Sequence, residues 1–434
     1  MQKVPLPSSE NPRIVIIGGG FAGIKLIKKL KNQPVQIVLF DRNNYHTFQP
    51  LLYQVATAGL EPDSIADPLR KQLEPVKNFF FRMGEVYSIN PDSKTISTEI
   101  GEVDYDYLVL ATGSQTNYFG NESIMQNGFP LKQIPQALDL RSHILQNFEA
   151  ANITTDADEL ASRMNVVIVG GGPTGVEVAG AMGELKKNIL PGDYPELDFD
   201  QMKITLLEGD KRLLQGMSTE SGDRALRYLS KFHVDVRLNT MVKSYDGKVA
   251  HLGDDTTINT HTLIWAAGVK GNFPKGINEE AIEHGRIKVN AYNMVEGLEN
   301  VFAIGDIASM KTDEFPKGYP MLAPVAIQQG QHLAENFKLL LKEKPLKPFK
   351  YKDNGAMATI GRNKAVADIG KMKVGGFAAW LIWMFVHLVS IIGFRNKIIV
   401  FSNWVWNYFT YDKGTRLIIR KFIPKNKIRE DINV

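Results

Sequence analysis

The chain has 434 residues, a formal net charge of +4 and ordinary hydrophobic, aromatic and charged fractions. At roughly 150 residues per domain, this length predicts two to three domains with large cores. The chain contains no cysteine, which excludes a redox-active disulfide, cysteine persulfide chemistry, cysteine-ligated iron–sulfur clusters and cysteine-type zinc sites.

The N-terminal segment, residues 1–7, has neither an apolar core nor an arginine-rich amphipathic pattern. We therefore expect neither a secretory signal nor a transit peptide, and a chain on the cytoplasmic side of a bacterial cell.

The first predicted strand, residues 14–17, leads into the turn Gly18-Gly19-Gly20-Phe21-Ala22-Gly23 and a predicted helix. This order is the dinucleotide-binding fingerprint, because a pyrophosphate must approach bare backbone amides at a helix N-terminus. The next predicted strand, residues 36–40, ends at Asp41, where the fingerprint places an acid that bonds a ribose hydroxyl. The alternative is a flexible turn in an ordinary α/β sheet.

The same pattern recurs later in the chain. A predicted strand at residues 166–169 leads into Gly170-Gly171-Gly172-Pro173-Thr174-Gly175, and a second one at 203–207 ends at Glu208. A carboxylate here would repel a 2′-phosphate, which favours NADH over NADPH. Lys211 and Arg212 weaken that preference, since a nearby basic residue accommodates the phosphate.

Three further predicted strands end in small-residue turns. They end at Thr112-Gly113, at Gly268 and at Gly305-Asp306. Their order predicts two nested nucleotide-binding units, with the second inserted into the first. Asp306 is then placed to bond the ribityl or phosphate part of a flavin, and the alternative is an N-cap for a helix starting at Ile307.

The C-terminal region is apolar and rich in tryptophan. Residues 375–394 carry no Lys, Arg, Asp or Glu, which is long enough to span a bilayer. Four of the five tryptophans nevertheless fall within 380–406, and tryptophan prefers the headgroup boundary. Residues 395–434 carry nine basic and three acidic residues. This pattern favours an interfacial anchor, with one spanning helix or a buried dimerisation hairpin as alternatives.

Together these motifs resemble the two-dinucleotide-binding flavoproteins. Residues 47–56 (TFQPLLYQVA), 175–177 (GVE) and 323–328 (APVAIQ) resemble type II NADH dehydrogenase in particular. The resemblance implies an α/β fold with two Rossmann-like domains, similar to glutathione reductase without its disulfide. It assigns residues 1–120 and 291–345 to the FAD-binding domain, 121–290 to the NADH-binding domain and 346–434 to a C-terminal membrane-anchoring helical region.

The resemblance also implies an activity and its partners. The expected enzyme oxidises NADH through FAD and reduces a membrane quinone, menaquinone or ubiquinone, without pumping protons. It is expected as a homodimer bound peripherally to the cytoplasmic side of the inner membrane, that is, to a lipid surface. The alternatives are a soluble reductase of ferredoxin or rubredoxin and an NADH-sensing flavoprotein. We expect no metal ion and no nucleic acid partner.

Site residues follow from the same resemblance. It assigns to FAD Gly18 to Gly23, Asp41, Arg42, Val86, Thr112, Gly113, Gly305 and Asp306. It assigns to NADH Gly170, Gly172, Pro173, Thr174, Gly175, Glu208 and Gly268. Gln54, Ala326 and Ile327 complete the cofactor-binding set, and Glu177 and Gln328 are the catalytic candidates.

Two positions carry reservations of their own. Glu177, one turn into its predicted helix, has a role in quinone reduction or proton supply as its functional interpretation, and a capping or solvated carboxylate as the alternative. Pro324 stands where the family usually has glutamine. Because proline offers no side-chain donor, either Gln328 and backbone groups bind the quinone or the pocket binds it differently.

Overall fold

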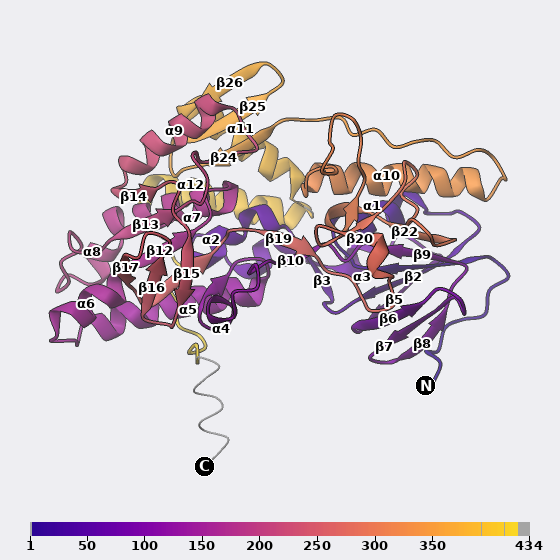
Figure 1. Ribbon diagram of the computed structural model, residues 1–434, viewed down its shortest axis with the longest axis horizontal. Coiled ribbons are helices and arrows are strands. Elements are labelled where there is room, and N and C mark those ends of the chain that lie inside the picture. The colour runs from indigo at the N-terminus through magenta and orange to yellow at the C-terminus, as the bar shows by residue number, and fades with distance from the viewer. Residues whose placement is uncertain (1, 392, 412, 424–434) are drawn as a thin grey trace, which may run out of the picture. The chain divides into compact units, whose positions relative to one another are not determined.

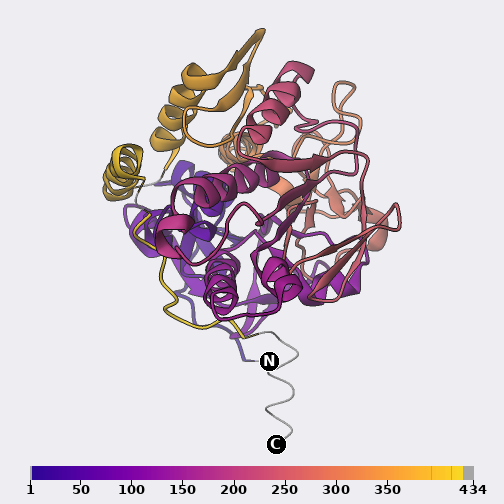
Figure 2. The same ribbon diagram turned by 90° about the vertical axis from the view of Figure 1, so that its left-hand side faces the viewer.

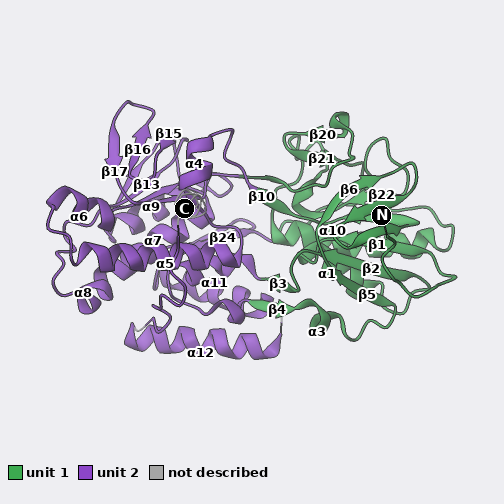
Figure 3. Ribbon diagram, turned by 90° about the horizontal axis from the view of Figure 1, so that it is seen from below, with its two compact units in different colours: residues 1–47, 66–115, 269–353 green, residues 48–65, 116–268, 354–434 purple. Residues whose placement is uncertain are grey.

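The computed structural model describes residues 2–391, 393–411 and 413–423. The chain forms two compact units (Figure 3). Unit 1 comprises residues 1–47, 66–115 and 269–353, and unit 2 comprises residues 48–65, 116–268 and 354–434. Residues 116–268 of unit 2 stand between two segments of unit 1 in the sequence. The grouping of residues 48–65 with unit 2 had no signal in the sequence.

The central sheet of unit 1 has five parallel strands in the order β22-β9-β1-β2-β5. Figure 1 labels β22, β9, β2 and β5. The strands are β1 (Arg13–Ile17), β2 (Gln36–Asp41), β5 (Phe79–Met83), β9 (Tyr107–Leu110) and β22 (Val301–Ala303). Alternate side chains enter two different cores, as expected of a parallel sheet covered on both faces. Ile14 and Ile16 pack with helices α1 (Phe21–Lys29) and α10 (Ala323–Leu340), whereas Val15 and Ile17 share a core with the antiparallel sheet β6-β7-β8.

Unit 2 is built on a second parallel sheet, in the order β11-β18-β12-β13-β14. Its strands are β11 (Phe129–Pro130), β12 (Val166–Val169), β13 (Ile204–Leu207), β14 (Val234–Arg237) and β18 (Thr262–Trp265). One core joins Val167, Val169 and Leu263 of the sheet to the antiparallel sheet β15-β16-β17. The main helices of this part are α5 (Ile134–Ala151), α7 (Pro173–Asn188) and α9 (Thr219–Ser230).

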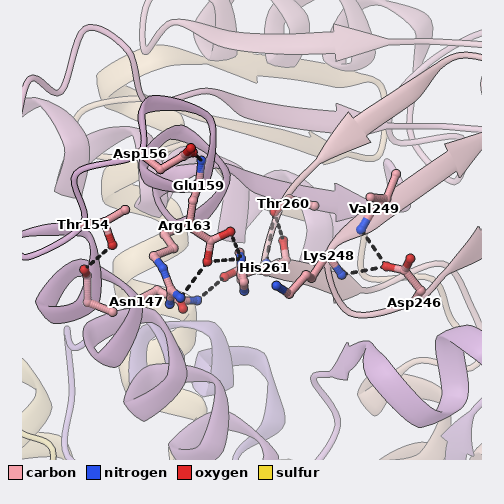
Figure 4. Close-up of polar contacts among 12 residues, drawn as sticks. Asn147, Thr154, Asp156, Glu159, Arg163, Asp246, Lys248, Val249, Thr260 and His261 are labelled. Atoms are coloured by element: carbon pink, nitrogen blue, oxygen red, sulfur yellow. Dashed lines mark hydrogen bonds and ion pairs between the residues drawn. The ribbon is translucent and has the colours of Figure 1, made fainter.

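A polar cluster fastens helix α6 (Ala157–Met164) beside the start of β18 (Figure 4). Asp156 caps the helix by accepting a hydrogen bond from the Glu159 amide at 2.8 Å. The Glu159 carboxylate then pairs with Arg163 at 2.6 Å and lies 3.3 Å from Nε2 of His261. The His261 amide donates to the Ser162 carbonyl at 3.0 Å, so side-chain and backbone bonds fix the same edge.

The C-terminal part of unit 2 is a three-stranded antiparallel sheet followed by two helices (Figure 2). The elements are β24 (Ala356–Thr359), β25 (Ala365–Ile369), β26 (Met372–Gly375), α11 (Gly376–Ser390) and α12 (Phe394–Thr410). Helix α11, which contains most of the uncharged run, ends at Ser390. The chain turns at Gly393, whose φ is +86°. Within the described residues, no helix combines the length and the apolar character needed to cross a bilayer.

Short elements complete the two units. Those of unit 1, including the boundary strand β10, are β3 (Tyr45–Thr47), β4 (Ala66–Pro68), α3 (Leu69–Leu73), β6 (Val86–Asn90), β7 (Thr95–Thr98), β8 (Gly101–Asp104), β10 (Ser114–Thr116), β19 (Val269–Gly271), η3 (Glu279–Ala281), β20 (Ile282–Glu283), β21 (Arg286–Lys288), η4 (Gly305–Ile307) and β23 (Ala308–Ser309). Those of unit 2 are η1 (Gln49–Leu51), α2 (Leu52–Ala56), η2 (Pro62–Ser64), α4 (Glu122–Asn127), α8 (Leu190–Asp193), β15 (Val242–Tyr245), β16 (Val249–Leu252) and β17 (Thr257–Asn259).

Candidate functional site

The glycine turn of unit 1 has the backbone that the fingerprint requires. Gly18 has φ +109°, and a Cβ there would lie 2.3 Å from the Ala111 carbonyl oxygen. Gly20 caps helix α1 without a side-chain bond, and no heavy atom lies within 4 Å of the position its Cβ would occupy. A Cβ at Gly23 would lie 2.1 Å from the Gly18 carbonyl oxygen. The space beside Gly20 is therefore open for a ligand at the helix N-terminus, and the positions of Gly18 and Gly23 admit only glycine.

The turn of unit 2 repeats this geometry. Gly170 has φ +111°, and Gly172 caps helix α7 with no heavy atom within 4 Å of its Cβ position. A Cβ at Gly175 would lie 1.8 Å from the Gly170 carbonyl oxygen. The third glycine of each turn is therefore needed because a side chain there would clash with the carbonyl oxygen of the first glycine. The nearest side chains of the sheet are farther away, at 3.6 Å. Pro173 opens the helix, where its missing N–H costs nothing.

The two acids that follow the second strands hold these turns from the side. Asp41 accepts hydrogen bonds from the amides of Gly19 at 2.7 Å and Asn43 at 2.8 Å. Glu208 accepts from the amides of Gly171 and Asp210. Burial raises the pKa of Asp41, and the amides of Asn43 and Gly19 partly offset that effect. Each acid was predicted to bond a ribose hydroxyl. In the structure its carboxylate bonds the backbone of the glycine turn and holds that turn in place.

Other residues assigned to FAD also lie in unit 1, most of them directly after strands of its parallel sheet. Gly305, with φ +78°, donates its amide to Oε1 of Gln329 at 2.7 Å. Asp306 accepts a hydrogen bond from the Ser114 hydroxyl at 2.5 Å and lies inside turn η4, whose N-cap is Ile304, so the N-cap alternative for Asp306 is wrong. The remaining assigned residues of this unit are Thr112, whose hydroxyl donates to the Asn272 carbonyl, Gly113 at φ +68°, Val86 at the start of β6, and the exposed Arg42.

His46 was missed by the sequence analysis. Its Nδ1 lies 3.2 Å from the Gly19 carbonyl oxygen, and its ring meets Phe21 edge-on at 4.7 Å. The side chain is 4% exposed, and burial lowers its pKa to about 4. A neutral imidazole therefore supports the first glycine turn. A lone histidine 23 residues beyond the turn gave no local signal, because only the β3 strand returns it there.

Residues assigned to NADH lie around the second turn. Gly268 has φ +155°, and a Cβ there would lie 2.9 Å from the Phe119 ring. Thr174 is exposed at the start of α7. The Arg212 guanidinium donates to the carbonyls of Met217 at 2.9 Å and Gln215 at 2.7 Å. Arg212 is thus engaged by the backbone, which strengthens the electrostatic case for NADH made by Glu208.

Glu177 lies on helix α7 and is 8% exposed. Its Oε1 is 3.5 Å from the amide nitrogen of Thr359, at the end of strand β24. Burial raises the pKa of Glu177 to about 8, and the Thr359 amide and the Trp383 indole only partly offset this effect. The Trp383 N–H influences the carboxylate without completing a hydrogen bond to a described residue. The solvated and capping alternatives for Glu177 are therefore wrong, and the carboxyl holds a proton at neutral pH.

A cavity of about 120 Å³ in unit 2 contains Glu177. Its lining comes from the 48–65 segment, helix α7, the residues after β24 and both C-terminal helices. Polar lining residues include Tyr53, Gln54 and Arg362, and apolar cover comes from Trp383 and Trp404. The arrangement places a protonated carboxyl in a largely apolar enclosure, which suits the transfer of a proton to a bound apolar molecule.

Gln54 and Gln328 differ in their surroundings. Gln54 lines the cavity with Glu177. Gln328 lies in unit 1, on helix α10, and its amide exchanges two hydrogen bonds of 2.9 Å with the backbone of Lys352. Ala326 is buried against Gly305, and Ile327 follows it on the same helix. Pro324 occupies the first turn of α10, where a proline is tolerated because no helical N–H is needed.

Two of the four C-terminal tryptophans, Trp383 and Trp404, do not lie where headgroup preference predicted. Trp383 is 2% exposed and stacks on His387 at 4.2 Å, and Trp404 is buried against Trp383 at 5.5 Å. Trp380 is half-buried beside Tyr408, and Trp406 is mostly exposed. The prediction was wrong for Trp383 and Trp404, because these indoles cover the Glu177 cavity.

The exposed apolar side chains of the two helices are instead mainly aliphatic and phenylalanine. Nine of them recur every fourth residue on α11 and every third or fourth on α12, and Val386 and Trp406 are exposed beside them. The nine are Phe377, Leu381, Phe385, Val389, Phe394, Ile398, Phe401, Val405 and Phe409. This apolar face, defined by these nine residues, is the kind of contiguous apolar surface that marks an interaction site.

The basic residues of the tail are only partly available to solvent. Arg416 pairs with Asp193 at 2.6 Å and Arg420 with Asp139 at 2.7 Å. Burial lowers the pKa of Lys413. Lys425, Lys427 and Arg429, with the acids Asp412, Glu430 and Asp431, lie outside the described residues. The charge count of the tail therefore overstates the free positive charge on the described part.

Comparison with known proteins matches this architecture along almost the whole chain. Residues 12–330 match the family described as pyridine nucleotide-disulphide oxidoreductase, and residues 354–411 match the NDH2 C-terminal domain. A protein named type II NADH:quinone oxidoreductase NdhA from Mycobacterium tuberculosis is 36% identical, over 95% of this chain and 90% of its own length. A type II NADH:quinone oxidoreductase from Staphylococcus aureus is 28% identical, over 86% and 94%.

A solved structure, NDH2 from Plasmodium falciparum in complex with NADH, has the same fold. Its TM-score is 0.86 at 21% identity, and the match covers 95% of this chain and 100% of that one. The disulphide in the broader family's name has no counterpart here, because the chain lacks cysteine. The chain belongs to the pyridine nucleotide-disulphide oxidoreductases and, within them, to the type II NADH:quinone oxidoreductase family.

Proposed function

We propose that this protein oxidises NADH and reduces a quinone, without moving protons across a membrane. NADH supplies a hydride, and one further proton balances the reaction, which yields NAD⁺ and quinol. The observation that carries the proposal is the carboxyl of Glu177, which is 8% exposed and lines a largely apolar cavity. Burial raises its pKa to about 8. It is the group in unit 2 best suited to deliver a proton to a quinone oxygen.

The glycine turns fit the two dinucleotides. No heavy atom lies within 4 Å of the Cβ positions of the cap glycines Gly20 and Gly172, so the space beside these helix starts is open. The first and third glycines of each turn have no room for a side chain. We assign FAD to the turn of unit 1, with Asp41 and Asp306, and NADH to the turn of unit 2, with Glu208. When bound, FAD supplies two-electron chemistry that links hydride acceptance to quinone reduction. The protein residues bind, orient and shield the reactants.

We assign Gln54 and Glu177 to the quinone cavity. Gln328 stays a weaker candidate, because Lys352 already satisfies both ends of its amide. Burial raises the pKa of Glu177 to about 8, so its carboxyl can supply a proton to the cavity at neutral pH. The quinone that we propose as substrate is menaquinone or ubiquinone.

We further propose that the apolar face of α11 and α12 binds a lipid surface. Its nine exposed apolar side chains lie on the helices whose opposite sides cover the cavity. Insertion of such a face into the headgroup region gives a quinone dissolved in the bilayer a short route to that cavity. The protein is then peripheral, on the cytoplasmic side of a bacterial inner membrane. We also propose that the protein is a homodimer, as the family resemblance implies, and sedimentation tests this.

The activity test uses the FAD-loaded protein with NADH and a menaquinone or ubiquinone analogue in sealed liposomes. We expect one quinol per NADH and no transmembrane potential. A protein that ignores quinone but reduces ferredoxin or rubredoxin would support the soluble reductase instead. Negligible turnover with every acceptor would support the NADH sensor.

The membrane test needs point variants, because truncation before α11 would also remove Trp383 and Trp404 from the cavity. Phe385→Asn and Phe409→Asn change two side chains of the apolar face that are 67% and 77% exposed. Ile153→Asn, at an 83% exposed position elsewhere in unit 2, is the matched control. We expect weaker liposome binding for the first two only. Binding equal to that of the unmodified protein would contradict the lipid proposal.

A further inference from the structure

Three side chains form a hydrogen-bonded chain from helix α12 to the Glu177 cavity. The Trp404 indole donates from Nε1 to Oε1 of Gln54 at 2.9 Å, and Nε2 of Gln54 lies 2.8 Å from the Tyr53 hydroxyl oxygen. All three residues line the cavity. The chain joins two segments more than 300 residues apart in sequence, since Gln54 and Trp404 differ by 350 positions.

The direction of every bond in this chain is fixed by chemistry. An indole N–H donates and cannot accept, so the Gln54 amide must present its oxygen to Trp404. The amide nitrogen of Gln54 is then left facing Tyr53, and it donates to the hydroxyl oxygen. The Tyr53 oxygen is consequently an acceptor in this bond, and its own hydrogen is directed elsewhere.

The Tyr53 hydroxyl is a donor without an assigned acceptor among the described residues. The residue is 6% exposed, and its recorded side-chain bond is the one it receives from Gln54. The two threonine hydroxyls of the cavity are committed, because Thr57 donates to the Tyr53 carbonyl at 2.9 Å and Thr359 to the Gly361 and Lys364 carbonyls at 3.3 Å. Burial raises the pKa of Tyr53, which keeps its proton in place.

We propose that Tyr53 donates a hydrogen bond to a carbonyl oxygen of the quinone, and that Gln54 and Trp404 are positioning residues that aim this hydroxyl into the cavity. The inference rests on the proposed quinone reductase function. A quinone carbonyl only accepts hydrogen bonds, and negative charge grows on its oxygen as electrons arrive. A donor already aimed at that oxygen therefore stabilises the transition state more than the ground state.

The first test replaces the donor. Tyr53→Phe removes the hydroxyl and keeps the ring, and we expect kcat/KM for decylubiquinone and menadione to fall about tenfold to a hundredfold. NADH oxidation with ferricyanide, which accepts electrons without a carbonyl to bind, is expected to stay within about twofold. Tyr194→Phe is the control, because this tyrosine of unit 2 donates to Glu149 at 2.9 Å and does not line the cavity.

The second test addresses aiming. Trp404→Phe removes the donor that orients Gln54, whereas Trp406→Phe removes an exposed indole two residues away. We expect a loss with quinone for Trp404→Phe only. The double variant with Tyr53→Phe is expected to lose no more than Tyr53→Phe alone, because both changes act through one hydroxyl. A purely structural role for Trp404 would give additive losses and would lower ferricyanide reduction too.

The outcomes separate this inference from the proposed function. A wild-type protein that reduces no quinone would overturn the proposed function. A wild-type protein that reduces quinone, beside a Tyr53→Phe variant that equals it in kcat/KM, would overturn the hydrogen-bond assignment alone. Additive losses in the double variant would remove the positioning role of Trp404 and leave that of Tyr53.

Discussion

Gly180 of helix α7 lies directly against the backbone of Ile360. A Cβ at Gly180 would be 2.8 Å from both the carbonyl carbon and the carbonyl oxygen of Ile360. Ile360 follows Thr359, whose amide faces the Glu177 carboxylate one helical turn before Gly180. This close approach therefore sets the distance between the C-terminal sheet and the buried acid.

We predict that Gly180→Ala destabilises the protein although alanine favours helix. The helical gain is about 1 kcal/mol, whereas forcing a methyl against a backbone costs about 1–3 kcal/mol or more. Displacement of β24 would also take the Thr359 amide from Glu177 and lower quinone activity. Urea unfolding and quinone assays measure the two effects. Gly192→Ala, where no atom lies within 4 Å of the Cβ position, is the control and should be neutral or slightly stabilising.

The pH dependence of stability should reveal the raised pKa of Glu177. Burial raises the pKa of its carboxyl from 4.5, the ordinary value expected in the unfolded chain, to about 8 in the folded protein. The folded state therefore binds the extra proton between these values, so the stability contribution is full below pH 4.5 and is lost as pH rises through 8. Glu177→Gln carries no such loss, and its stability relative to the unmodified protein should grow by on the order of 4 kcal/mol between pH 4.5 and 8.

Denaturant unfolding of both proteins at pH 5, 7 and 9 checks this prediction. In the quinone assay, the unmodified protein should lose activity as pH rises through about 8, because the proton at Glu177 is then absent. Glu177→Gln should be slow at every pH and lack that descending limb. Parallel stability curves for the two proteins would show that Glu177 does not titrate in this range.

Glu208 should govern the choice between NADH and NADPH. Glu208→Gln keeps a side-chain oxygen for the Gly171 amide but removes the charge that repels a 2′-phosphate. We expect kcat/KM for NADH to fall and the NADPH to NADH ratio to rise about tenfold or more. Asp210→Asn removes a neighbouring exposed charge and keeps the backbone amide of residue 210 that bonds Glu208. An equal rise in the ratio for Asp210→Asn would attribute the preference to general surface charge.

The sequence predicted those parts of the molecule that depend on backbone constraints. Gly18 and Gly170 have to adopt positive φ, and Gly23 and Gly175 have to avoid a carbonyl, so these requirements are written as glycine at fixed spacing. The nested order of the two units followed from the strands that each turn requires. Local rules of this kind do not depend on distant residues.

The cavity could not be predicted in the same way. Tyr53, Thr359 and Trp404 belong to three segments far apart in the sequence, and only tertiary packing brings them together. Trp383 and Trp404 were misjudged because an indole suits both a headgroup boundary and a cavity wall, and composition does not distinguish the two. The face left to solvent is instead set by which side of each helix packs on unit 2.

His46 should make the protein sensitive to acid. Burial lowers the pKa of its imidazole from 6.5 to about 4, so the unfolded chain takes up a proton first as pH falls. The contribution of His46 to stability is then present above pH 6.5 and is lost as pH falls toward 4, by on the order of 2–3 kcal/mol.

His46→Gln retains a donor for the Gly19 carbonyl at an uncharged side chain, so it should be less stable than the unmodified protein at pH 7 and lose less stability on acidification. Unfolding of the FAD-loaded proteins at pH 7, 5.5 and 4.5 measures both quantities, with the exposed His251→Gln as the matched control. If His46→Gln and the unmodified protein lose stability in parallel, the histidine is protonated in the folded state and the buried, neutral imidazole is the wrong description of the first glycine turn.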